Sequence, residues 1–166
     1  MNRRTLLLGM AAVPVATTAS ANWFTDIKDA VTGHIEDAKG RIFGEDMIVP
    51  NATITATGTF DETAEGQDAA HWATGSVSIV EAEGKRYIQL EADFNSGPLP
   101  DGHVFYSKDT DINDEVGFWR TTQVGVEKLK LGKGASFYEV PMDAEINSVT
   151  IWCLRFGEYI GSADVS

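Results

Sequence analysis

Cys153 is the only cysteine in this chain of 166 residues, and it carries the most reactive side chain. A thiolate can attack a disulfide or bind a metal, but it forms at neutral pH only beside a cation, a metal or a helix N-terminus. Arg155 lies two residues further on, is expected on the same face of a strand, and could lower the pKa of the thiol. A free cysteine is also among the most often buried residue types. The residues alone therefore leave a reactive thiol and an inert core thiol both open.

The cysteine count excludes several kinds of chemistry. One cysteine cannot close a disulfide within the chain, so Cys153 is an intermolecular partner, a cofactor ligand, a reactive thiol or a core residue. The chain has no C-x-x-C-H motif for covalent haem attachment, and no paired cysteines or histidine-rich tract for structural zinc. No serine lies in a nucleophile elbow, and the spacing of Glu91 and Asp93 alone cannot place two carboxylates across a substrate. An enzyme is therefore the less favoured class.

Two histidines could act with the cysteine or independently of it. His71 stands at the entrance of a predicted strand beside Trp72, where an imidazole can face a cavity and bind a metal or carry a proton. His103 enters another strand after a loop rich in glycine and proline. For both, capping a turn is the more common role.

The acidic stretch 109–115 is a candidate calcium loop. Asp109, Asp111 and Asn113 match the first three oxygen positions of such a loop. The sixth position should be glycine and is Asp114, and the twelfth should be glutamate and is Arg120. A solvated acidic loop is the favoured interpretation, and calcium is not an expected cofactor.

The elements that position these residues are mostly strands. Residues 53–60, 76–80, 87–94, 104–106, 126–131, 136–140, 147–156 and 160–165 read as short strands, with turn signals every 8–12 residues and no helix between them. One of these signals, Ala82-Glu83-Gly84-Lys85, predicts a hairpin-type turn. In 87–94, Ile88, Leu90, Ala92 and Phe94 are expected on one face. The pattern predicts an all-β fold, an antiparallel β-sandwich of about eight strands over residues 53–166.

The N-terminal part has a different pattern. Residues 1–21 combine a charged start, an apolar run and Ala19-Ser20-Ala21, which is typical of a secretory signal peptide. Arg3-Arg4 also resembles a twin-arginine signal. In residues 22–50, apolar residues at helical spacing predict one amphipathic helix over about 24–39, followed by a linker. The protein is therefore expected to be periplasmic or secreted, with no stable membrane span after cleavage.

The formal net charge of the chain is −12, and loss of residues 1–21 would remove two positive charges. Such an acidic protein is not expected to bind nucleic acid or anionic lipid, since both are polyanions.

Short motifs in a fixed order resemble the DM-thirteen domain, a small secreted module often found beside DOMON cytochrome domains. The resemblance covers about residues 56–166. Its matching pieces are Gly58-x-Phe60, His71-x-Ala73-x-Gly75-x-Val77-x-Ile79, Leu90-x-x-Asp93-Phe94 with Gly97-Pro98, Val104-x-Tyr106-Ser107, Phe137 to Pro141, Ser148-Val149-x-Ile151-Trp152-Cys153-x-x-Phe156 and Gly161-x-Ala163.

The resemblance implies a β-sandwich-like domain with an electron-transfer or redox role centred on the cysteine. Cys153 would act as a bare thiol or as a haem-iron ligand, with His71 as a second cofactor-binding residue. The chain has no DOMON domain, so a redox partner would be a separate protein. The alternative is a non-catalytic binding or structural module of the cell envelope, with Cys153 in the core and aromatic residues such as Trp119 at a binding surface.

Overall fold

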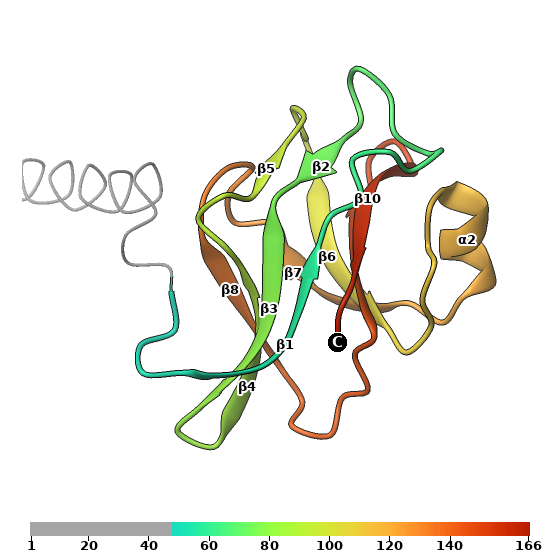
Figure 1. The fold of residues 1–166 in the computed structure, drawn as a ribbon. Helices are drawn as coiled ribbons and strands as arrows, with labels where there is room; N and C mark the ends of the chain where they lie inside the picture. Colours follow the sequence, from blue (N-terminus) through green and yellow to red (C-terminus); the bar gives the residue numbers. More distant parts are fainter. Residues whose placement is uncertain (1–47) are drawn as a thin grey trace, which may run out of the picture. The chain divides into compact units, whose positions relative to one another are not determined.

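The computed structural model describes residues 48–166, which fold into two antiparallel sheets packed face to face (Figure 1). One sheet has the strand order β1-β3-β4-β8, and the other has the order β10-β9-β6-β7. A third, two-stranded sheet pairs β2 with β5. The strands are β1 (Thr53–Thr59), β2 (Ala73–Thr74), β3 (Ser76–Ala82), β4 (Lys85–Leu90), β5 (Asn95–Ser96), β6 (Gly102–Ser107), β7 (Val124–Lys128), β8 (Ser136–Val140), β9 (Ser148–Cys153) and β10 (Glu158–Asp164).

The core lies between the two four-stranded sheets. Its residues come from alternate positions along the strands, as a half-buried strand requires. Ile79 and Ile88 are fully buried from one side, and Val149 and Ile151 from the other. The predicted all-β sandwich of about eight strands is confirmed, since eight strands form these two sheets.

The two sheets also approach each other along both sides. At one side, Thr57 of β1 exchanges two backbone hydrogen bonds of 3.1 Å with Ser166, which follows β10. At the other, the backbone N–H of Lys130, just after β7, donates to the hydroxyl of Tyr138 on β8 over 2.9 Å. The outer strands of each sheet therefore lie beside those of the other.

The predicted turn between β3 and β4 is confirmed. Glu83 and Gly84 both have positive φ values, 53° and 74°. Two consecutive residues of this kind form the type I′ turn that matches the twist of a two-residue hairpin.

Three details of the sequence prediction are wrong. The strand 87–94 ends at Leu90, where a turn closed by a bond from Phe94 N to Glu91 O leaves Ala92 exposed. The strand 147–156 ends at Cys153, because residues 154–157 turn back into β10.

The third correction is a helix between the strands, α2 (Glu115–Arg120). Asp114 caps it by accepting a hydrogen bond from Gly117 N over 2.6 Å.

The predicted signal peptide and amphipathic helix lie outside the described residues. Within residues 48–166, no helix is long and apolar enough to cross a membrane.

Candidate functional site

Cys153 is the last residue of β9, and its side chain is a free thiol with 1 % exposure. It shares the inner face of the strand with Val149 and Ile151, as the alternation predicts, and belongs to the core between the sheets. Arg155 does not share this face. It lies in the turn after β9, where its guanidinium carbon is 5.7 Å from the ring centroid of Phe156.

Two leucines cover the core beside Cys153. Gly102 on β6 pairs directly with Cys153, and such opposed residues present the same face. A Cβ atom placed on Gly102 would lie 2.9 Å from Leu99 Cδ1 and 3.3 Å from Leu129 Cδ2. These leucines therefore occupy the space next to the thiol at the end of the sandwich.

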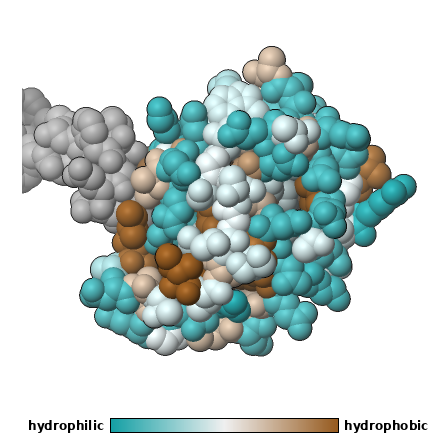
Figure 2. Space-filling view, viewed as in Figure 1, coloured by the Kyte–Doolittle hydropathy of each residue, from teal (hydrophilic) through white to brown (hydrophobic). Residues whose placement is uncertain are grey.

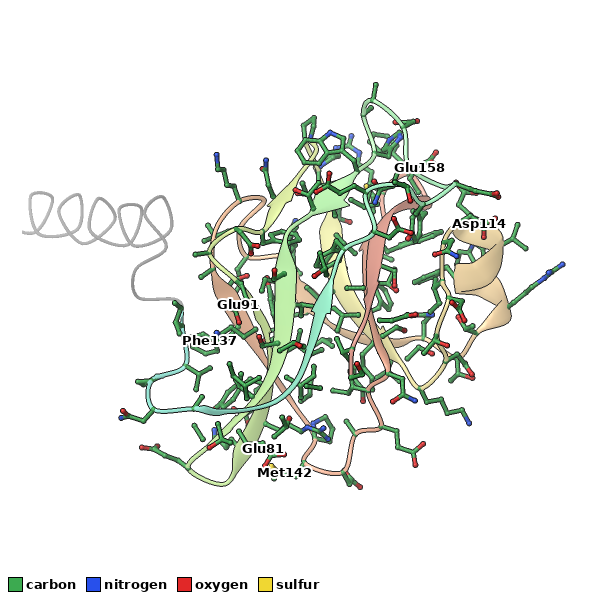
Figure 3. All side chains as sticks on the ribbon, in the orientation of Figure 1. Glu81, Glu91, Asp114, Phe137, Met142 and Glu158 are labelled. Atoms are coloured by element: carbon green, nitrogen blue, oxygen red, sulfur yellow. The ribbon has the colours of Figure 1, made fainter. Side chains whose placement is uncertain are left out.

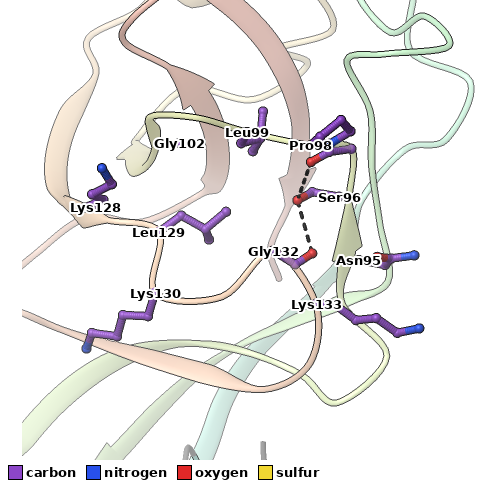
Figure 4. Close-up of a pocket in the computed structure, with 11 residues that line it drawn as sticks. Asn95, Ser96, Pro98, Leu99, Gly102, Lys128, Leu129, Lys130, Gly132 and Lys133 are labelled. Atoms are coloured by element: carbon purple, nitrogen blue, oxygen red, sulfur yellow. Dashed lines mark hydrogen bonds between the residues drawn. The ribbon is translucent and has the colours of Figure 1, made fainter. Parts of the chain in front are cut away.

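Leu99, Leu129 and Gly102 also line a cavity of about 440 Å³ (Figure 4), which we call the lysine-rimmed cavity. Its other lining residues are Asn95, Ser96, Gly97, Pro98, Lys128, Lys130, Gly132 and Lys133. Figure 4 shows Leu129 pointing into the ring of lining residues, while Lys130 and Lys133 extend away from it. The two leucines thus line the cavity and also pack against the core that contains the thiol.

The opposite face of β9 carries Trp152, which is 1 % exposed. Its ring stacks on Phe118 of α2, with centroids 4.0 Å apart and planes 10° from parallel. Trp119, which is 70 % exposed, meets Trp152 edge to face at 5.3 Å. With Phe105 and Leu154 these rings line an open groove of about 370 Å³, which we call the aromatic groove.

The histidines lie away from the thiol. The Nδ1 atom of His71 is 3.1 Å from the carboxylate of Asp68, which also accepts hydrogen bonds from the backbone N–H groups of Ala70 and His71. These bonds, chiefly those from the backbone, lower the pKa of Asp68 to about 2. His103 pairs with Trp152 on the outer face of the sheet, and its ring is 3.3 Å from Asp101. Neither histidine lines the lysine-rimmed cavity.

A haem group does not fit Cys153 in this arrangement. The thiol lies in a packed apolar core and lines none of the described cavities. A second iron ligand from His71 would have to come from a loop where its ring is held by Asp68. The described residues thus leave Cys153 as a thiol.

The residues of the candidate calcium loop form local hydrogen bonds. Asp109 accepts a bond from Thr122 N over 3.2 Å, and the backbone N–H of Asp111 donates to Asp164. The carbonyl of Asn113 accepts from Gly66 N. Within residues 48–166, no three histidine, cysteine, aspartate or glutamate side chains are placed to hold a metal ion.

Carboxylates gather beside α2 instead. Figure 3 shows Asp114 and Glu158 on the side of the domain where α2 lies. A hydrogen bond with Glu158 raises the pKa of Glu115, and the nearby Asp114 raises it further, while His71 has the opposite effect. A hydrogen bond between two carboxyl groups requires a proton on one of them, which is why this contact raises the pKa of Glu115.

The residues that sequence reasoning missed are those that cover the thiol and the tryptophan. Leu99, Leu129 and Phe118 come from a loop, a strand end and a six-residue helix, and no local pattern links them to Cys153 or Trp152. The one available signal was Asp114 followed by Glu115, which is typical of a helix start.

Fold and site together define a small all-β domain with one buried thiol between a lysine-rimmed cavity and an aromatic groove. The family model described as electron transfer DM13 matches residues 43–165, about three quarters of the chain, and the protein belongs to this family. Its domain is thus an electron-transfer-type module. Comparison with curated proteins and with solved structures gave no match.

Proposed function

We propose that the protein is an exported, periplasmic redox module in which the thiol of Cys153 is the working group. The observation that supports this role most directly is the position of Cys153 at the end of β9. Leu99 and Leu129 pack against the core beside Gly102, the strand partner of Cys153, and also line an open cavity. A small movement of these side chains would give a partner access to the sulfur.

The chemistry available to a single thiol is exchange with a disulfide. Once exposed, Cys153 loses its proton to water, and the thiolate attacks one sulfur of a partner disulfide. The partner's S–S bond breaks, its second sulfur leaves as a thiolate, and a mixed disulfide forms between Cys153 and the partner. The thiolate of a second, dithiol protein then attacks the partner's sulfur in the mixed disulfide and releases Cys153, and its other thiol displaces the partner, so that two electrons pass from the dithiol to the partner disulfide. A separate redox protein is therefore required.

Export is supported by the sequence of residues 1–21, with its paired arginines, apolar run and Ala19-Ser20-Ala21. An oxidising compartment supplies disulfide partners, which are rare in the reducing cytosol. Mass spectrometry of the mature protein from the periplasmic fraction tests this part, and a chain that keeps Met1 in the cytosolic fraction would contradict it.

Alkylation of the folded protein tests the role of the thiol. Iodoacetamide should label native Cys153 slowly, and Leu129→Ala should raise the labelling rate by about tenfold or more, because it removes a side chain beside the thiol. Val124→Ala is the matched control, since Val124 is 41 % exposed and lies outside the cavity. Equal rates in the two variants would argue against access through this cavity. A Soret band in the absorption spectrum would indicate bound haem, and Cys153 would then be assigned as an iron ligand instead of a bare thiol.

The second candidate is a non-catalytic binding module of the cell envelope. The 1 % exposure of Cys153 among core side chains favours it, together with the exposed Trp119. Under this function, the Cys153→Ala variant should bind its partner as well as the unchanged protein does. The aromatic groove would be the binding surface. A colourless protein whose thiol resists alkylation until it unfolds would favour this candidate over the redox module.

A further inference from the structure

The aromatic groove presents one strongly exposed indole. Trp119 is 70 % exposed, the highest value among the large hydrophobic side chains of residues 48–166. For comparison, Figure 2 shows a face covered mainly by hydrophilic residues, with hydrophobic residues in small groups. An exposed ring that continues into a groove of other aromatic side chains forms a contiguous apolar surface, and such a surface marks an interaction site.

Trp119 is held in place although it is exposed. Its ring centroid is 5.3 Å from that of Phe118, with the planes at 87°, and 5.3 Å from that of Trp152, with the planes at 81°. Phe118 and Trp152 are themselves buried, with 3 % and 1 % exposure. Because two fixed rings brace the indole, little side-chain entropy is lost when a ligand stacks on it.

Two neutral polar side chains, Thr121 and Gln123, line the same groove. The side-chain nitrogen of Gln123 donates to the hydroxyl of Thr121 over 2.6 Å, and this hydroxyl donates to the carbonyl of Gly117 over 2.9 Å. Within residues 48–166, the other end of the Gln123 amide, Oε1, is buried and accepts no hydrogen bond. Such an acceptor is costly to leave without a donor. A ligand hydroxyl in the groove, with a small rotation of the Gln123 side chain, would supply the missing bond.

The groove favours an uncharged ligand. Figure 3 shows Asp114 and Glu158 on the side of the domain where α2 lies, so an anion would be repelled there. No charged side chain lines the groove to compensate for this repulsion. Its lining residues are Phe105, Phe118, Trp119, Thr121, Gln123, Trp152 and Leu154.

The high exposure of Trp119 narrows the class of ligand further. A molecule that is apolar on all sides is best bound in an enclosed cavity, which removes most of its surface from water. A ligand on Trp119 keeps one side in water, so it needs one apolar face and polar edges. A pyranose ring has this form, because its C–H groups make a face that stacks on the electron-rich side of an indole and its hydroxyl groups lie around the edge.

We infer that the aromatic groove is a binding site for neutral saccharides, with a pyranose ring stacked on Trp119 and one hydroxyl donating to Oε1 of Gln123. Trp152 and Cys153 lie on opposite faces of β9, in separate clusters of buried residues. Saccharide binding therefore requires nothing of the thiol, and the inference goes beyond the proposed redox function.

The test is an NMR titration of the ¹⁵N-labelled chain with three neutral oligosaccharides: cellohexaose, maltohexaose and the hexamer of N-acetylglucosamine. At least one should shift the indole N–H signal of Trp119 and the side-chain amide signals of Gln123 in a saturable manner. The hexamer of galacturonic acid, which carries a carboxylate on every ring, should bind about tenfold or more weakly.

Two variants test the contacts. Trp119→Ala should weaken binding by about tenfold or more, because it removes the stacking surface. Gln123→Leu keeps the size of the side chain but removes the acceptor, and should weaken binding by about threefold or more. The matched control is Phe156→Ala, which removes an exposed aromatic ring (61 %) that does not line the groove. Its affinity should stay within about twofold of the original.

Four results would overturn the proposal. They are no saturable shift with any neutral oligosaccharide, shifts confined to another surface, equal losses in Trp119→Ala and Phe156→Ala, and self-association of the chain through the groove. Repeating the titration with Cys153→Ala separates this site from the redox role. Saccharide affinity should be unchanged in this variant, and failure of the groove would leave the alkylation of Cys153 as an independent test of the thiol.

Discussion

Cys153 and Trp152 are consecutive residues, yet the two faces of β9 place them in different surroundings. On the inner face, Cys153 is sealed in the core behind Leu99 and Leu129. On the outer face, Trp152 is equally buried but is in ring contact with Trp119 at the surface. Reaching Cys153 requires movement of side chains, whereas Trp152 already contacts a ring that is exposed at the surface.

The largest effect is expected from Trp152→Ala. Loss of the buried indole and of its stack on Phe118 should lower the free energy of unfolding by about 3–5 kcal/mol. Trp119→Ala removes an exposed ring and should change stability by about 0.5 kcal/mol or less. Urea unfolding of the two variants measures both. Similar losses would mean that the exposed Trp119 contributes as much to the free energy of unfolding as the buried Trp152.

A smaller loss is expected when the inner face is made polar. In Cys153→Ser the hydroxyl would be buried among apolar side chains, at a cost of about 1–3 kcal/mol. Cys153→Ala is the control, because it removes the sulfur without adding a polar group, and it should be the more stable variant by chemical denaturation. A serine variant as stable as the alanine variant would indicate that water already reaches this position.

Gly102→Ala alters the boundary between thiol and cavity directly. The new methyl group would lie 2.9 Å from Leu99 Cδ1, so this flexible side chain must shift. We expect a cost of about 1 kcal/mol and a change in the alkylation rate of Cys153. Gly132 lines the same cavity, and a methyl group there would lie 3.4 Å from its nearest neighbour. Gly132→Ala should therefore change neither the stability nor the alkylation rate. The two rates and unfolding energies, compared side by side, decide whether Leu99 covers the thiol.

The smallest effect concerns the carboxylates beside α2. Because the pKa of Glu115 is raised in the folded state, the folded protein holds a proton that the unfolded chain releases. The associated stabilisation is present below the ordinary glutamate pKa of 4.5 and is lost as the pH rises through the raised value. Glu158→Gln should remove this dependence and raise the melting temperature slightly at neutral pH.

Thermal unfolding followed by circular dichroism across this pH range measures the effect. Glu62→Gln is the control for the loss of one negative charge on an exposed residue. If both variants show the same pH profile, the interaction between Glu115 and Glu158 has no measurable influence on stability.

Local patterns in the sequence predicted the alternation within β9 and the turn at Glu83-Gly84. Both follow from side-chain period and backbone preference, which act over a few residues. The strand ends were less predictable. Phe156 continues the apolar pattern of β9, but the chain turns before it and leaves it 61 % exposed. Apolar character alone does not reveal where tertiary structure ends a strand.

The surroundings of the site were beyond sequence reasoning for a related reason. The cavity beside Cys153 joins residues 95–102 to residues 128–133, and the groove joins Phe105, Trp119 and Trp152. These segments meet only through the pairing of β6 with β7 and β9. The family resemblance supplied the fold and the redox class, but it said nothing of what lies beside the cysteine.

The approach of the two sheets along both sides affects how other chains can attach. Unpaired edge strands normally act as templates for an added strand, both in peptide recognition and in aggregation. Here β1 lies against the chain that follows β10, and β7 leads into a bond with β8. Partner binding to residues 48–166 is thus expected to rely on side chains, with specificity set by their shape and charge. For the same reason, concentrated protein should be slow to form fibrils while it remains folded.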